Sequence, residues 1–479
     1  MIKFAKTKYR LQKLFVLIGS LTFGFSPLSA QLVPAPDVSR ALEIGVEDGF
    51  TLISVGDVIM SSSVSQLTDD PFREVVERLH SGDVVFGNFE NTAIDFETFD
   101  GYPAPLFGGL RLRMHPDAVS DLHTLGFDIM SRSNNHTTDW GIEGLIETSR
   151  VLDDVGIVHA GAGKTMGEAR RGGFLETPKG RIGMVSMASS FMSMSPALDP
   201  NSGRMLGRPG LSALRTTPHY FVTESELAML RRIRDEQPEG PVSSSVRVPD
   251  DDPEDELSLF GVRYKVGDRR GREYTINQYD LGEILYGIRA AKIDSDFVIA
   301  TIHAHNPGNW SDEAPGFLEE LARSAIDSGA DQFVGHGPHQ LRGIEIYQGK
   351  PIFYSLGNFF FQVELQSPLS SDIYQNYDID PDSTTDGEFL SWWMGNSFGD
   401  PIWYESVIAE SRYEDGRVAE IKLYPVELGY ELPGASRGIP RTARPDVGQK
   451  ILETLQRLSQ PYGTEIEIED GIGVIRVAG

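Results

Sequence analysis

Residues 297–305, FVIATIHAH, place two histidines directly after an apolar run with the length and composition of a buried β-strand. Residues 332–339, QFVGHGPH, repeat the arrangement, with a short apolar run, a glycine and two more histidines. In α/β proteins the ligand crevice lies outside the carboxyl ends of the strands, so polar side chains there are candidates for a functional site. The histidines at this predicted sheet edge are His303, His305, His336 and His339.

Three earlier strand ends carry the same kind of side chain. The apolar runs 51–55, 83–86 and 127–130 are each followed within a few residues by carboxylate, amide or imidazole groups. These groups are Asp57, then Asn88 and Glu90, then Asn135, His136 and Asp139. Each short motif alone is common in turns, and a lone histidine is usually a helix, strand-end or loop residue. Five of the ten histidines, however, follow predicted strands, and this ordering indicates a metal site.

The ligand types limit which metals fit. Carboxylate, amide and imidazole groups together suit zinc, manganese or iron, so we expect one or two divalent ions of this kind. Two such ions about 3.5–4 Å apart would bind a phosphoryl or similar oxyanion between them. The chain has no cysteine, which excludes thiolate ligands and disulfides.

Helices are predicted between the strands, which gives an α/β fold with central β-sheets flanked by helices. The core domain is expected to span residues 50–360, with an insertion at 191–275. A lid-like insertion follows at 361–405, and residues 406–479 supply strands and a helix that complete the domain. Loops at strand ends commonly carry binding function, so both insertions are expected to lie over the candidate ligands. The helices are expected at residues 71–80, 116–125, 141–155, 223–237, 280–292, 313–328 and 447–458.

The first thirty residues have the order of a secretory signal peptide. Five basic residues lie in the first thirteen positions, and the mostly apolar stretch 14–25 is too short to span a membrane comfortably. Cleavage after Ala30 would leave an exposed lead-in at 31–49 and a periplasmic or extracellular protein. An uncleaved N-terminal anchor is the alternative.

The charge of the chain limits its partners. A net charge of −27 repels nucleic acid and anionic membranes, so neither is expected as a partner. A polyanionic ligand would need a local basic patch or a bound cation. The acidic run 250–256 is expected to be a solvated loop, because it lacks the spaced ligands and the central glycine of a calcium loop.

The order of these motifs resembles that of the CapA family of poly-γ-glutamate capsule biosynthesis. The motifs are Gly-Asp at 56–57, Gly-Asn-x-Glu at 87–90, Asn-Asn-His-x-x-Asp-x-Gly at 134–141, His-x-His at 303–305 and Gly-His-x-Pro-His at 335–339. The most specific match is the stretch GIEIYQGKPIFYSLGNF at 343–359. The resemblance covers residues 50–190 and 275–360.

That family resembles the calcineurin-like metallophosphoesterases, which implies an α+β four-layer sandwich and a role for each motif residue. Under the resemblance, His136 is not a ligand. It stabilises developing charge or protonates the leaving group, and Asp139 orients it. The implied metal ligands are Asp57, Glu90, Asn135, His303, His336 and His339, with Asn88 and His305 as further candidates.

One position departs from the phosphoesterase pattern. Ile59 stands two residues after the first aspartate, where those enzymes usually place a histidine, so the first metal site is short of a ligand. The resemblance implies an exported metal-dependent hydrolase that makes, releases or trims an anionic polymer such as poly-γ-glutamate. Its substrate would be an anionic polymer or a phosphoester, and its partner the membrane-bound capsule synthesis machinery. The alternative is a non-catalytic assembly or export factor with the same fold. A carbohydrate-binding protein would rest only on the tryptophans of the insertions.

Overall fold

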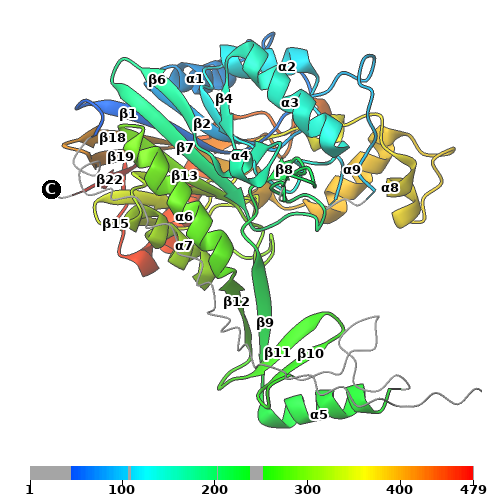
Figure 1. Cartoon of the computed structure of the whole chain (residues 1–479). Coiled ribbons are helices and arrows are strands. Elements are labelled where there is room, and N and C mark those ends of the chain that lie inside the picture. The colour runs from blue at the N-terminus through cyan, green and yellow to red at the C-terminus, as the bar shows by residue number, and fades with distance from the viewer. Residues whose placement is uncertain (1–44, 106–108, 202, 238–251, 478–479) are drawn as a thin grey trace, which may run out of the picture. The chain divides into compact units, whose positions relative to one another are not determined.

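Two β-sheets stacked face to face form the centre of the structure (Figure 1). The computed structural model describes residues 45–105, 109–201, 203–237 and 252–477, so the predicted signal peptide lies outside the described residues. The first sheet has the strand order β21-β22-β19-β18-β1-β2-β3-β4, with β17 paired to β1 and β20 to β19. The second sheet has the order β15-β16-β14-β13-β7-β6.

The strand bounds are as follows. The first sheet contains β1 Phe50–Ile59, β2 Val84–Phe89, β3 Ile129–Ser131, β4 Val158–Ala160, β17 Asn358–Phe361, β18 Glu405–Glu414, β19 Arg417–Glu427, β20 Arg441–Thr442, β21 Glu467–Glu469 and β22 Ile472–Arg476. The second contains β6 Gly173–Thr177, β7 Gly180–Ala188, β13 Phe297–His303, β14 Gln332–His336, β15 Ile344–Tyr347 and β16 Lys350–Phe353.

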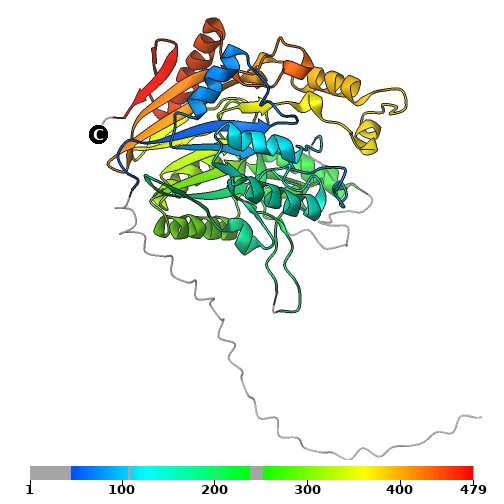
Figure 2. The same cartoon turned by 90° about the horizontal axis from the view of Figure 1, so that it is seen from above.

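Helices cover the outer faces of both sheets, which makes the fold a four-layer sandwich and confirms the predicted class. One apolar cluster joins the first sheet to α1, α2 and α3, and another joins the second sheet to α6 and α7. A third cluster fills the space between the sheets and includes α10. Figure 2 shows the blue helix α1 and the green helix α6 on opposite sides of the strands. The bounds are α1 Asp70–Leu79, α2 Pro116–Thr124, α3 Gly141–Val155, α6 Gln278–Ile293, α7 Gly316–Asp327 and α10 Pro445–Ser459.

Side chains alternate across each strand, and this sets the direction of the candidate ligands. In β13, Phe297 and Ile299 pack between the sheets, whereas Val298 and Ala300 pack against the helices. His303 continues the inward series. The sheets are also joined by hydrogen bonds, because Gln332 Nε2 donates to Ser54 Oγ (2.6 Å) and accepts at Oε1 from the hydroxyl of Tyr413 (2.7 Å).

The segment 191–275 contains a small sheet of its own. Its strands β9 Thr216–Val222, β10 Glu256–Leu259, β11 Val262–Val266 and β12 Gly271–Ile276 pair in the order β10-β11-β9-β12. Helix α5 Glu224–Asp235 packs on it through Leu227, beside Leu257 and Leu259. The acidic run was expected to be all loop, but Glu256 begins β10 and pairs with Lys265, while residues 250–251 lie outside the described residues.

The segment 361–405 is mostly helical. It contains α8 Ser371–Asn376 and α9 Asp386–Ser397, and its first and last residues belong to β17 and β18. Phe389 and Met394 of α9 pack into the apolar cluster of the first sheet. Among the described residues, no helix combines the length and the apolar character needed to cross a membrane.

A buried ion pair fastens the start of the small sheet to α6. Asp280 accepts hydrogen bonds from Arg170 Nη2 (2.7 Å) and from Arg215 Nε (2.7 Å) and Nη2 (2.8 Å). Burial raises the pKa of Asp280, but the hydrogen bonds from the two arginines outweigh it and hold the pKa below its usual value. The charge of Asp280 therefore stabilises the fold above the usual carboxyl pKa, and this stabilisation is lost as the pH falls through the lowered pKa.

Asp280→Asn is expected to lower the free energy of unfolding by about 3 kcal/mol at pH 7, because it leaves Arg170 buried without its counter-charge. Chemical denaturation of both proteins measures the difference, which should shrink as the pH is lowered. Asp70→Asn is the control, since it breaks an exposed pair with Arg73 and should change stability by less than about 0.5 kcal/mol. Equal effects of the two variants would contradict this account.

Candidate metal centre

The ends of neighbouring strands bring the candidate ligands together. Asp57 of β1 lies opposite Asn88 of β2, and His303 of β13 lies opposite His336 of β14. The first pair belongs to the first sheet and the second pair to the second sheet, and all four side chains are buried. The centre therefore forms between the two sheets at the carboxyl ends of their parallel strands.

Asp57 lies at the middle of the cluster. Its Oδ1 is 3.5 Å from His336 Nδ1 and 3.9 Å from His303 Nδ1, and its Oδ2 is 3.6 Å from His339 Nδ1. Burial raises the pKa of Asp57, but the imidazoles of His336, His303 and His339 outweigh it and leave the pKa far below its usual value. Asp57 is thus a carboxylate ready to bind a cation.

The glycine before Asp57 is required by a close approach of two backbone segments. Asp57 N donates to Gly357 O (2.9 Å), and a Cβ at Gly56 would lie 1.9 Å from that same oxygen. A side chain at position 56 would separate β1 from the Gly357-Asn358 segment. The Gly-Asp motif therefore has a packing reason as well as a chemical one.

Glu90 supplies a second buried carboxylate without hydrogen-bond partners on either oxygen. Its Oε1 is 3.5 Å from His303 Nε2 and 3.8 Å from His136 Nε2. Burial, and then the charge of Asp57, raise the pKa of Glu90 well above its usual value. A divalent ion at this point would reverse that shift, since it favours the ionised carboxylate.

Asn88 has a different environment. Its Nδ2 donates to Asp57 Oδ1 (2.8 Å) and lies 3.1 Å from His303 Nδ1, while its Oδ1 accepts from Asn134. The amide is therefore engaged in holding Asp57 and His303 in place. This geometry favours Glu90 over Asn88 as a metal ligand.

His305 reaches the same volume as His303. The two Nε2 atoms are 3.0 Å apart, and His305 Nδ1 is 2.6 Å from Asn309 Oδ1. Burial, and then the charge of His339, lower the pKa of His305 to about 3, so the imidazole is neutral at pH 7. In the tautomer that donates from Nδ1 to Asn309, Nε2 is an acceptor that faces His303 and lies in the same group of candidate ligand atoms as Glu90. His305 can therefore supply the ligand that Ile59 does not.

His339 is oriented by Asn358, a residue for which the sequence predicted no individual role. Its Nδ1 is 2.9 Å from Oδ1 of Asn358, whose amide nitrogen donates to the carbonyls of His339 (3.2 Å) and Trp403 (2.9 Å). Asn358 also lies opposite Asp57 in the β1–β17 pairing. Such a partner leaves Nε2 of a metal-binding histidine available and fixes its ring.

The remaining buried polar atoms show that the site fits a cation. Asn135 Oδ1 and both ring nitrogens of His336 are buried and have no hydrogen-bond partner. An unsatisfied buried polar group costs about 1–3 kcal/mol, so several in one place need an explanation. Groups of Asp57, Glu90 and His339, and of Glu90, His303 and His305, each offer ligand atoms within 4.8 Å of one another. Carboxylate, imidazole and amide groups in this arrangement suit a divalent metal ion.

His136 and Asp139 form a hydrogen-bonded pair beside the cluster. His136 Nδ1 is 2.6 Å from Asp139 Oδ2, which also accepts from Leu112 N (2.7 Å). This contact directs Nε2 of His136 toward Glu90. The pair has the geometry of a proton donor held by a carboxylate.

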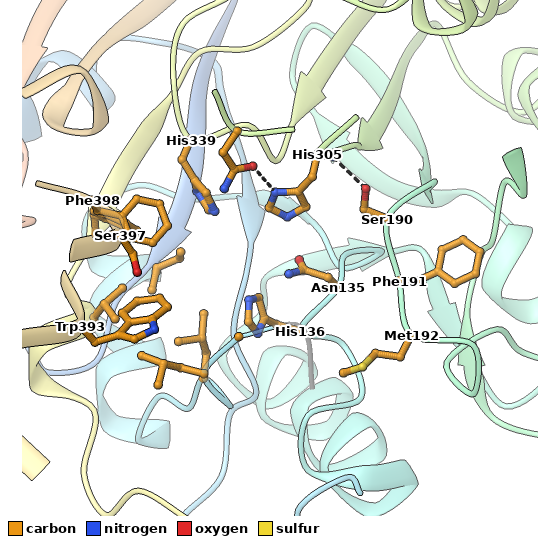
Figure 3. Close-up of a pocket in the computed structure, with 17 residues that line it drawn as sticks. Asn135, His136, Ser190, Phe191, Met192, His305, His339, Trp393, Ser397 and Phe398 are labelled. Carbon is orange, nitrogen blue, oxygen red and sulfur yellow. Dashed lines mark hydrogen bonds between the residues drawn. The ribbon is translucent and has the colours of Figure 1, made fainter. Parts of the chain in front are cut away.

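A cavity of about 500 Å³ opens beside these residues (Figure 3). Asn135, His136, His305 and His339 line one part of it, and Ile59 also faces it. The other lining residues are Gly109, Leu110, Leu112, Ser190, Phe191, Met192, Asn309, Phe361, Val363, Trp393, Ser397 and Phe398. The beginning of the first insertion and helix α9 of the second therefore both contribute to its walls.

The fold and the site define a four-layer α/β protein with two facing sheets and a carboxylate–imidazole cluster at their strand ends. Residues 51–363 match the family described as bacterial capsule synthesis protein PGA_cap, and the chain belongs to that family. It is 45% identical to the uncharacterized protein y4sH of Sinorhizobium fredii over 92% of this chain and 96% of that protein. It is 23% identical to the capsule biosynthesis protein CapA of Bacillus anthracis over 65% of this chain and 59% of that protein.

Similarity to solved structures is distant. The NAD nucleotidase of Haemophilus influenzae matches with a TM-score of 0.31 and 10% identity, over 86% of this chain and 56% of that chain. A likeness at this level carries no argument about function.

Proposed function

We propose that this protein is an exported, metal-dependent hydrolase that acts on an anionic capsule polymer such as poly-γ-glutamate, or on a phosphoester precursor of it. The observation that carries the proposal is the set of buried ligand atoms without partners beside the His136–Asp139 pair, where Asn135, His136 and His339 line one cavity. The relatives whose descriptions name capsule biosynthesis support the polymer and the place of action outside the cytoplasm.

One or two ions of zinc, manganese or iron would be held by the described cluster. When bound, such an ion supplies Lewis-acid chemistry that polarises the bond to be cleaved and activates water. Asp57 is the carboxylate closest to three imidazoles, and Glu90 lies between His303 and His136. The ligands in this proposal are Asp57, Glu90, Asn135, His303, His336 and His339, with His305 as an additional ligand.

His136 is the proton donor in this proposal. Asp139 accepts the Nδ1 hydrogen, fixes the ring orientation and stabilises the imidazolium form, in which Nε2 also carries a hydrogen that can pass to the leaving group. The backbone N–H of Leu112 holds Asp139 from the other side. Because the pair is buried, it keeps one geometry while the substrate enters.

A non-catalytic assembly factor that works with membrane-bound capsule machinery is the second candidate. The observation that favours it is Ile59, an apolar side chain at the cavity where the phosphoesterase pattern has a histidine. In that case metal would stabilise the fold without hydrolysis.

Purified mature protein is expected to contain one or two equivalents of zinc, manganese or iron, because Glu90, Asn135 and His336 have buried ligand atoms without partners in the protein. Inductively coupled plasma mass spectrometry measures the metal, and the same preparation is screened with phosphoesters and γ-glutamyl peptides. Metal-dependent turnover supports the enzyme. Metal without turnover of any of these compounds supports the assembly factor, and a metal-free protein that takes up none of the three ions contradicts both.

A further inference from the structure

The cavity has a polar strip between two apolar sides. In Figure 3, Trp393 and Phe398 lie on one side of His136, and Phe191 and Met192 lie on the other. The first side comes from α9 and the residue after it, and the second from the loop that follows β7. Two separate segments thus place apolar groups on opposite sides of the candidate proton donor.

The cavity wall carries no formal charge outside its imidazoles. None of its lining residues, all of which belong to the described part of the chain, is Asp, Glu, Lys or Arg. The nearby Arg111 is engaged elsewhere, since its Nη2 contacts Ala104 O and Asp372 Oδ2, both at 2.6 Å. A carboxylate against either apolar side would lose its hydration and gain no cationic partner, which is unfavourable.

The aromatic side of the cavity is held in place before any ligand arrives. Trp393 Nε1 donates to Tyr377 OH (2.8 Å), and the Trp393 and Phe398 rings lie 5.5 Å apart at 53°. The Phe398 ring also meets His339 edge-on at 5.6 Å. Aromatic faces fixed in this way favour a flat or apolar group of a ligand.

We propose that the site takes a phosphodiester whose two ester groups are uncharged and present apolar or ring faces, rather than a terminal phosphomonoester or a γ-glutamyl segment. The phosphoryl group faces the polar strip, and one ester group lies on each apolar side. Hydrolysis breaks one P–O bond to an alcohol, and the imidazolium of His136 gives the departing alcohol its proton. Water forms the new P–O bond and releases a proton, which restores the imidazolium. The products are a phosphomonoester and an alcohol.

This inference rests on the proposed function for the cleavage step, but binding tests it independently. Calorimetry on metal-loaded protein compares diphenyl phosphate, phenyl phosphate and a γ-glutamyl tripeptide. Diphenyl phosphate is expected to bind about tenfold more tightly than phenyl phosphate, and the tripeptide more weakly than either. Trp393→Ala is expected to remove about that tenfold advantage.

Trp392→Ala is the matched control. Trp392 is the next residue on α9, is 45% exposed, and is not part of the cavity wall. Phe191→Ala tests the opposite side and keeps the test decisive if Trp393→Ala fails to fold. Equal binding of the diester and the monoester, or equal effects of Trp393→Ala and Trp392→Ala, would overturn the inference.

Turnover separates this inference from the proposed function. Bis(4-nitrophenyl) phosphate and 4-nitrophenyl phosphate are offered to the same proteins. If neither is cleaved but diphenyl phosphate binds in a Trp393-dependent way, the phosphoesterase activity fails and the inference stands. If only the monoester is bound and cleaved, the hydrolase stands and the inference is wrong.

Discussion

His136→Ala is expected to reduce the hydrolytic rate by about a hundredfold or more, which is the usual contribution of a positioned general acid. The metal content should stay near that of the wild type, because Nδ1 of His136 is held by Asp139 and His136 is the proton donor, not a ligand, in the proposed site. Initial rates on a cleaved phosphoester, together with metal analysis of the same sample, give both quantities. Asp139→Asn should lower the rate as well, since it removes the acceptor that fixes the imidazole.

An exposed histidine provides the control for this change. His123 lies on the solvent side of α2, so His123→Ala should leave both the hydrolytic rate and the metal content unchanged. If His136→Ala retains full biological function in a strain without the wild-type copy, the assembly factor is the better account of the protein, even with metal bound. Loss of metal from His136→Ala would instead make His136 a ligand.

His336→Ala is expected to weaken metal binding by at least about a hundredfold, because both ring nitrogens of His336 are buried in the cluster without another partner. It should also lower thermal stability. A ligand present at about a thousand times its Kd stabilises the native state by about 4 kcal/mol, and that contribution would be largely lost. Competition with a chromogenic chelator measures affinity, and thermal unfolding with and without chelator measures the linked stability.

His159→Ala is the matched control, because His159 of β4 is mostly buried and its Nε2 lies 3.3 Å from Asp153 Oδ1, a residue outside the cluster. It should change stability without changing metal affinity. A His336→Ala protein that binds metal like the wild type would remove His336 from the ligand set. If chelator changes the thermal unfolding of neither His336→Ala nor the wild type, the cluster is not a metal site.

The strands that end at the site could be predicted because each joins an apolar run to a polar motif. Helices with clear end signals were also predictable. The helix expected at 141–155 matches α3, which ends before Gly156 at φ +83°. The helix expected at 223–237 corresponds to α5, which begins with a capping box formed by Thr223 and Glu226. The local sequence contains the information that decides these elements.

Features that depend on distant partners could not be predicted in this way. Strand β17 has only four residues, and it forms a strand because it pairs with β1, about three hundred positions earlier. The role of Asn358 follows from that pairing. Apart from its place in the family motif, nothing in the local sequence indicates that Asn358 orients a histidine. The strands β9 and β11 were missed because their residues are mostly half-buried and lack a clear alternation. Strands β10 and β12 do alternate, but they have only four and six residues.

The positions of the tryptophan side chains also could not be predicted from the sequence. Trp403 is buried in the apolar cluster of the first sheet, whereas Trp392 is 45% exposed and Trp393 lines the cavity. All three belong to one insertion, and the adjacent Trp392 and Trp393 differ only in the side of α9 on which they lie. Composition could not separate these roles, because each depends on what the helix packs against.

The pairing of β1 with β17 also determines at what stage of protein synthesis the metal centre can form. Asp57 emerges early, but its neighbour Asn358 and the Trp403 carbonyl that holds Asn358 come from the last third of the chain. Long-range pairings of this kind form late, since the intervening chain must be brought together first. A nascent or truncated chain would therefore carry the ligand residues without a binding site, and acquisition of the metal becomes a late event that marks completion of the fold.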